Sequence, residues 1–151
     1  MYQKILCPVD GSPASNRGTK EAINIAKSLN AKLRFIHVID TYYPIIDEAG
    51  NYVLLDVAKS LRKKAEKVIK KAKATAETAG VIAESKLSET LGGRASTFIV
   101  EEADAWPADL IVMGTRGIKG FSRLVMGSDA EHVVRTSNVP VMLINNAKKK
   151  S

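Results

Sequence analysis

The sequence predicts an α/β fold: a single doubly wound sheet of five parallel strands, with helices on both faces. Two observations support this prediction. Short apolar segments alternate along the chain with longer segments whose apolar residues recur at helical spacing. Two of the apolar segments, one near the N-terminus and one ending at Gly114, run directly into glycine-rich loops. Such loops are typical of strands that end at a ligand-binding crevice.

Five segments have the character of strands. The first, QKILCPVD, is short, apolar and rich in branched residues, and it stops at the turn sequence DGSP, as a buried strand does. The third, VIAESKLS, alternates apolar and polar residues, which is typical of a half-exposed strand at a sheet edge. The predicted strands cover residues 3–10, 32–40, 81–88, 109–114 and 139–145.

Helices are expected between these strands. Ser12 and Pro13 have the character of an N-cap and a first helical residue, and apolar residues then recur at helical spacing as far as Leu29. A second helix is predicted from about residue 55 to 79, ending at Gly80. A short helix follows within 92–106, and a last one covers about 128–136.

The alternation constrains the order of the strands in the sheet. Crossovers between parallel strands are right-handed, so the winding must reverse once if helices are to cover both faces. The loops on either side of that reversal separate and leave a crevice at the carboxyl ends of the strands. Placing the first and fourth strands side by side brings the loops DGS and GTRG to this crevice and predicts the order 3-2-1-4-5.

Length and composition are those of one globular domain. The chain has 151 residues, of which 1–146 are expected to form the domain and 147–151 a disordered basic tail. It contains no run of about 18 apolar residues, so no membrane span is expected. The start lacks the layout of a signal peptide, and Cys7 is the only cysteine. These features predict a cytoplasmic protein in which Cys7 is inert core.

The net charge of +7 suggests nucleic acid at first sight, but its distribution argues against that partner. Residues 59–73 hold eight Lys or Arg and one acid, whereas the chain outside this segment and the lysine tail has 12 basic and 15 acidic residues. Apolar residues alternate with these lysines at helical spacing, which indicates a solvated helix face. No aromatic residues interleave with them to stack bases.

The stretch GTRGIKGFSRLVMGSDAEHVV, residues 114–134, is the most informative motif. Gly114 and Gly117 leave a strand, nine residues follow, and Gly127 and Ser128 then enter a helix. A helix N-terminus presents unpaired N–H groups and the positive end of its dipole, and glycines allow a ligand to approach the backbone closely. The spacing therefore favours an anion site.

With this motif the chain resembles the universal stress protein family, in its nucleotide-binding branch. The G-x2-G-x9-G-S/T pattern of that branch is present, and the segments KILCPVDGS, FIHVID, ADLIVMGTRG, LVMGSDAEHVV and VPVMLI resemble family segments over nearly the whole chain. The resemblance implies a Rossmann-like fold of the adenine nucleotide alpha hydrolase type, AMP, ADP or ATP as ligand, and a homodimer formed through the last strand.

The resemblance also implies the site residues. Asp10 would meet the ribose or a phosphate-bound Mg²⁺, Val38 would offer its backbone to the adenine, and Met113 would line the base pocket. Gly114, Arg116 and Gly117 would wrap ribose and phosphates, and Gly127 and Ser128 would hold phosphate at the helix start. The implied set is Pro8, Asp10, Val38, Met113, Gly114, Arg116, Gly117, Gly127, Ser128, Asp129 and Ala130.

Asp129 and Ala130 depart from the family pattern, which has an uncharged residue and then Ser or Thr. A hydroxyl is lost and a carboxylate arrives at the place implied for a phosphate. Two like charges about 4 Å apart repel by roughly 1 kcal/mol in water and about 4 kcal/mol at intermediate dielectric. A preference for AMP or ADP over metal-free ATP is therefore expected, with Mg²⁺ partly restoring ATP binding.

Several of these residues also have purely structural interpretations. Ser128 and Glu131 form the S-x-x-E pattern of a capping box, and Asp10 before Gly11-Ser12 fits a simple turn. Arg116 fits a solvated surface as well as a phosphate. Tyr42 and Tyr43 follow the second strand, where they either cover the base or pack on the helices. The two histidines, with no Cys or Asp cluster near them, do not form a metal-ligand pattern.

Three functions remain open on the sequence. The leading one is a nucleotide-binding regulatory protein of the stress response, acting on a protein partner that the sequence does not identify. A slow ATPase is the second, although the P-loop lysine motif is absent. A pure interaction module is the third. For the dimer, the apolar strand 139–145 would lie at a sheet edge, where unpaired backbone groups invite a second copy.

Overall fold

The computed structural model describes residues 1–41, 48, 54–115 and 126–145. In these ranges strands and helices alternate in the predicted order. The elements are β1 (Lys4–Pro8), α1 (Pro13–Leu29), β2 (Lys32–Asp40), α2 (Leu54–Thr78), β3 (Ala83–Thr90), α3 (Ala95–Ala105), β4 (Leu110–Gly114), α4 (Ser128–Thr136) and β5 (Val141–Ile144). The basic tail, Tyr42, Tyr43, Arg116 and Gly117 lie outside the described residues.

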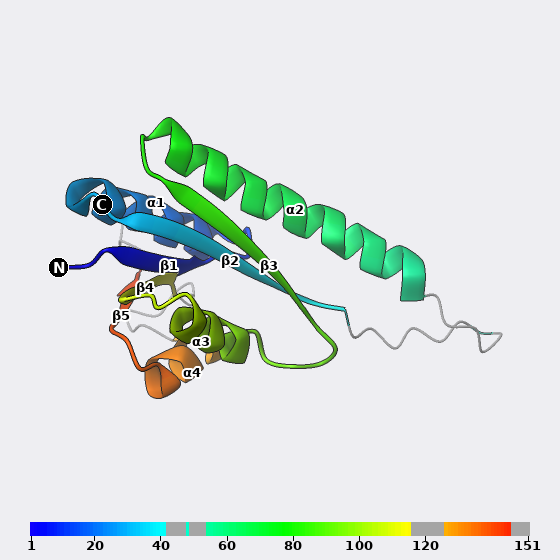
Figure 1. Ribbon diagram of the computed structural model, residues 1–151. Coiled ribbons are helices and arrows are strands. Elements are labelled where there is room, and N and C mark those ends of the chain that lie inside the picture. Colours follow the sequence, from blue (N-terminus) through cyan, green and yellow to red (C-terminus); the bar gives the residue numbers. More distant parts are fainter. Residues whose placement is uncertain (42–47, 49–53, 116–125, 146–151) are drawn as a thin grey trace, which may run out of the picture.

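The strands form one parallel sheet of order β3-β2-β1-β4-β5, which confirms the predicted order (Figure 1). The reversal of winding falls between β1 and β4. Ile5 and Leu6 of β1 pair with Leu110 and Ile111 of β4. The loops that follow β1 and β4 therefore leave the same edge of the sheet in adjacent positions. This is where the crevice was expected.

Helices cover both faces of the sheet (Figure 1). On one face α1 and α2 pack over Ile5, Phe35 and Val112, and on the other α3 and α4 pack over Leu6, Ile36 and Ile111. Neighbouring residues of each central strand thus point into different cores, which explains why these strands are apolar throughout. Cys7 is fully buried, and this burial raises the pKa of its thiol to about 12, consistent with inert core.

The helix ends explain why β3 begins later than predicted. Gly80, at φ +82°, donates its N–H to Glu77 O, and Val81 donates to Ala76 O at 3.0 Å. This pair of bonds is a Schellman motif, and it uses the Val81 N–H to close α2. The strand therefore starts at Ala83 instead of at residue 81. At the other end of the chain, Pro140 has no N–H to donate, and β5 begins after it.

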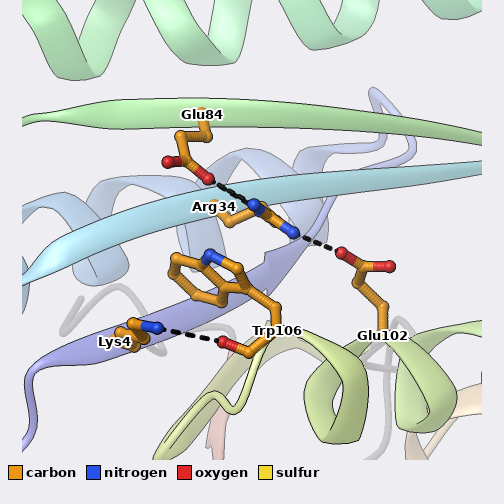
Figure 2. Close-up of polar contacts among 5 residues, drawn as sticks. All are labelled: Lys4, Arg34, Glu84, Glu102 and Trp106. Atoms are coloured by element: carbon orange, nitrogen blue, oxygen red, sulfur yellow. Dashed lines mark hydrogen bonds and ion pairs between the residues drawn. The ribbon is translucent and has the colours of Figure 1, made fainter.

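One polar cluster joins the sheet to α3 (Figure 2). Arg34 of β2 lies between Glu84 of β3 and Glu102 of α3, with nitrogen–oxygen distances of 2.5 and 2.6 Å. The guanidinium also stacks over the Trp106 ring at 4.5 Å, and Lys4 donates to the Trp106 carbonyl. The cluster ties three strands to the helix that forms one wall of the crevice.

Candidate functional site

A cavity of about 200 Å³ lies at the carboxyl edge of the sheet. Its walls come from the ends of β1, β2 and β4 and from the first turns of α1, α3 and α4. The residues that line it are Pro8, Val9, Asp10, Ser12, Ala14, Ser15, Ile36, His37, Val38, Ala95, Ile99, Met113, Gly114, Gly127, Ser128, Asp129 and Ala130.

The structure brings the predicted site residues together wherever it describes them. Pro8 and Asp10 at β1, Val38 at β2, Met113 and Gly114 at β4, and residues 127–130 at the start of α4 all line this one cavity. Arg116 and Gly117 fall outside the described residues. The geometry shows convergence on a cavity; the ligand-binding role of each residue stays a prediction.

The start of α4 is open toward a ligand. Gly127 is the N-cap residue, and none of the side chains that the structure describes caps this end of the helix. The N–H groups of Ser128, Asp129 and Ala130 belong to the first turn, where the helix itself offers no acceptor. Three donors and the positive end of the helix dipole therefore stand at the wall of the cavity.

The capping-box interpretation of Ser128 is wrong. Ser128 is the first helical residue instead of the cap, and the Glu131 carboxylate accepts from Arg135 at 2.6 Å instead of reaching back to the helix start. Gly127 provides the extended cap conformation that a serine was expected to provide. The Ser128 hydroxyl is therefore not committed to starting the helix.

The start of α1 is closed by its own residues. Ser15 N–H donates to Ser12 Oγ at 3.2 Å, Ser12 N–H donates to Asp10 Oδ1 at 2.8 Å, and Asp10 N–H donates to Ser15 Oγ at 3.0 Å. The turn interpretation of Asp10 is thus confirmed for one carboxylate oxygen. The carboxylate still lines the cavity, so it holds the turn and places a negative charge at the site.

The two glycines that line the cavity have different reasons to be glycine. A Cβ on Gly114 would lie 2.0 Å from the carbonyl oxygen of Ala14, so α1 packs directly on the end of β4 there. A Cβ on Gly127 would meet no heavy atom of the described residues within 4 Å, and its φ of −61° suits any residue. The packing of the described residues requires glycine at 114 but not at 127, where a side chain would fill space beside the cavity.

The remaining lining residues are mostly apolar. Ile36, Ile99, Met113 and Ala130 are buried, and Val38 packs against the same core. His37 donates from Nδ1 to the Val9 carbonyl at 2.5 Å, which fixes its ring at the end of β2. The cavity therefore combines an apolar wall with a set of backbone donors. That combination suits a ligand with a flat apolar part and an anionic part.

Some lining residues were not predicted. Ser12 and Ser15 had a visible signal, since they lie at the N-cap and in the first turn of the helix after β1, but Ser12 was interpreted only as a cap. Ala95 and Ile99 come from α3 and had no such signal, because nothing in the sequence places that helix beside residues 127–130.

In the described part of the chain, no three His, Cys, Asp or Glu residues gather as metal ligands would. None of the described helices has both the length and the apolar character that a membrane crossing requires.

Comparison with known proteins gives a consistent result. A model of the universal stress protein family matches residues 1–145. A universal stress protein of Methanocaldococcus jannaschii is 37% identical over 150 residues, covering 99% of this chain and 85% of the relative. The chain therefore belongs to the universal stress protein family.

Solved structures of the family share the fold. The universal stress protein of Lactobacillus plantarum is 27% identical and superimposes with a TM-score of 0.77, covering 95% of this chain and 97% of the other. A universal stress protein in complex with cAMP is 26% identical, with a TM-score of 0.67, covering 97% and 98%. The parallel five-stranded sheet is thus the family's architecture.

Proposed function

We propose that the cavity binds an adenine nucleotide and that the protein acts as a nucleotide-dependent regulator of the stress response. The observation that carries the proposal is the start of α4, a helix end that no described side chain caps, at Gly127, a glycine that the packing of the described residues does not require. Anions bind readily at such an end. The cAMP complex of a relative with this fold supports an adenine ligand.

In this proposal the apolar wall of the cavity binds the base, and the polar wall binds the ribose and phosphates. The adenine would lie against Val38 and Met113, with the Val38 backbone facing its edge. The ribose would lie near Asp10, and the phosphates would accept from the first N–H groups of α4 and the Ser128 hydroxyl. Pro8 and Gly114 would shape the floor, Arg116 and Gly117 would close over the phosphates, and Mg²⁺ would reach the site with the phosphates. Each of these roles is part of the proposal.

The charge of Asp129 bears on which of the adenine nucleotides binds most tightly. It is exposed but lines the cavity at the first turn of α4, where added phosphates would come closest to its charge. We expect AMP or ADP to bind more tightly than metal-free ATP. Because the carboxylate is solvated, the repulsion belongs to the lower end of the range, about 1 kcal/mol.

The first experiment is to denature the purified protein and identify any released nucleotide by ion-pair chromatography. Calorimetric titration of stripped protein with AMP, ADP and ATP, each with Mg²⁺ or EDTA, follows. Binding of AMP supports the site. If no nucleotide is released and none of the three gives heat, the interaction-module function replaces this one.

A slow ATPase is less well supported by the lining. Phosphoryl transfer requires neutralisation of the developing charge. Among the described residues that line the cavity there is no Lys or Arg, while Asp10 and Asp129 both bring negative charge. We therefore propose binding and regulation instead of efficient hydrolysis, and an ATP turnover assay with Mg²⁺ tests this directly.

The same proposal includes a homodimer through β5. Among the described strands β5 lies at the edge of the sheet and pairs with β4, so its outer backbone groups face away from the sheet. Met142 within this strand is 38% exposed, so part of a large apolar side chain is left uncovered. A two-fold related copy would cover both the strand edge and this side chain.

A further inference from the structure

The lysine-rich α2 carries a second cavity that is distinct from the site described above. It has a volume of about 390 Å³ and lies between α1 and α2, on the face of the sheet opposite α3 and α4. The two helices leave this space because α1 packs mainly over β4 and β1, whereas α2 packs over β2 and β3. We call this cavity the α1–α2 groove.

The floor of the groove is apolar and well packed. Val9 and Ala72 are 5% and 7% exposed, and Val68 packs beside them at the edge of the core. The turn after β1 closes one end, since a Cβ on Gly11 would lie 3.0 Å from the Val68 side chain. A ligand in the groove would therefore place an apolar group on this floor.

The rim of the groove is basic. Lys67 and Lys71 stand one turn apart on α2, and Lys20 faces them from α1. None of these three lysines forms an ion pair with another described residue. The neighbouring Lys73 is different, because its Nζ lies 3.7 Å from Glu77. Three cationic groups thus stand at the rim of an apolar floor, and the described residues that line the groove include no acidic side chain.

We propose that the α1–α2 groove binds a small amphipathic anion, with its apolar body on Val9, Val68 and Ala72 and its anionic group between Lys67, Lys71 and Lys20. The volume is within the range of small-molecule sites, roughly 300–1,000 Å³. The charge of the rim selects an anion, and the depth and packing of the floor select a ligand with a short hydrocarbon or aromatic part. This inference does not depend on nucleotide binding in the first cavity.

The test uses octanoate and its neutral amide, octanamide, as probes of equal apolar length. Both are titrated into the isotopically labelled full chain, and amide shifts are followed by NMR. We expect octanoate to shift the signals of Thr19, Val68 and Ala72, which line the groove and not the first cavity, and to bind more tightly than octanamide. Equal affinity for the two probes overturns the proposal, because the lysines would then contribute nothing.

Lysine variants test whether the charges at the rim of the groove are the ones that bind octanoate. Lys67→Ala with Lys71→Ala should weaken octanoate binding about fivefold or more, since each exposed ion pair contributes up to about a factor of five. Lys64→Ala with Lys70→Ala removes the same charge from α2 at positions that do not line the groove, and binding should be unchanged. Equal loss in both pairs overturns the proposal, because net charge alone would then explain it.

Two controls separate the groove from the first cavity. Saturating AMP should leave the octanoate shifts in place, whereas displacement by AMP, or shifts confined to Val38, Ser128 and Ala130, would assign the probe to the first cavity and overturn the proposal. Lys20→Ala tests the opposite wall on α1 and should also weaken octanoate binding. All of these lysines are exposed, so circular dichroism should show unchanged folding.

Discussion

Arg34 of β2 and Glu102 of α3 form a direct ion pair, 2.6 Å between Nη1 and Oε1, in which both side chains are mostly buried. Their side chains are 22% and 13% exposed, so the pair is shielded from the solvent that weakens most surface ion pairs. It is one of the polar links between the sheet and the helix that supplies Ala95 and Ile99 to the cavity (Figure 2).

Glu102→Gln is therefore expected to destabilise the protein by about 1 to 2 kcal/mol, because the guanidinium loses a charged partner at a mostly buried position. Urea denaturation measures this. The matched control is Glu131→Gln, which removes an exposed partner of Arg135 within α4 and should cost less than about 0.5 kcal/mol. Equal costs for the two variants would show that burial of the Arg34 pair adds nothing.

The cluster also predicts a pH dependence. The hydrogen bond from Arg34 lowers the pKa of the Glu84 carboxyl below its ordinary value. The Arg34–Glu84 interaction therefore stabilises the fold fully above the pKa that Glu84 has in the unfolded chain. This stabilisation is lost as the pH falls through the lower pKa that Glu84 has in the folded protein. Because Glu84 is 45% exposed, the loss should stay below about 1 kcal/mol. Urea midpoints at pH 7 and pH 3 should differ less for Glu84→Gln than for the unaltered protein.

The two glycines of the cavity should respond oppositely to alanine. Gly114→Ala places a Cβ against the Ala14 carbonyl and should destabilise the fold by about 3 kcal/mol or more. Gly127→Ala meets open space at an ordinary φ and should leave stability nearly unchanged while weakening nucleotide binding. Thermal melts and AMP calorimetry separate the effects. An unchanged AMP affinity in Gly127→Ala would argue against a ligand at the start of α4.

Asp129→Asn removes the charge that is expected to oppose additional phosphates. Binding of ATP in EDTA should become about fivefold tighter, corresponding to roughly 1 kcal/mol, while AMP binding should change less. Calorimetry of both nucleotides on the same protein preparation gives the ratio. The expected preference for AMP fails if the unaltered protein already binds metal-free ATP as tightly as AMP.

Met142→Lys should convert the proposed dimer into monomers. The side chain is at the centre of the edge strand, where a lysine would meet its own copy across a two-fold axis. Light scattering gives the mass of each form. Because Met142 is partly exposed in the single chain, the variant should still fold, and an unchanged dimer mass would rule out β5 as the interface.

Much of the fold was predictable because its signals are local. Apolar periodicity identified the strands and helices, and the two glycine-rich loops after β1 and β4 correctly indicated the neighbouring strands. β3 and β5 start later than predicted because of backbone hydrogen bonding: Pro140 has no N–H to donate, and the Val81 N–H is already used. Val81, which has the composition of a strand residue, donates its N–H to the end of α2.

The candidate site was predictable to the extent that its residues lie in loops after strands. Asp10 follows β1, Met113 lies near the end of β4, and Ser128 begins the helix after β4, so a parallel sheet must bring all three to one edge. Ala95 and Ile99 could not be foreseen, because the face on which α3 meets α4 depends on the packing of two helices against the sheet. The α1–α2 groove was hidden for the same reason.

The sequence by itself determined the order of the elements, the family and the positions of the glycines beside the cavity, because these follow from residue types and their spacing. Only the tertiary structure decided what approaches each glycine. Gly114 meets Ala14, a residue 100 positions away in the chain, whereas Gly127 faces open space. The physical reason is that close packing joins residues from separate elements, and a local pattern carries no information about which of them will meet.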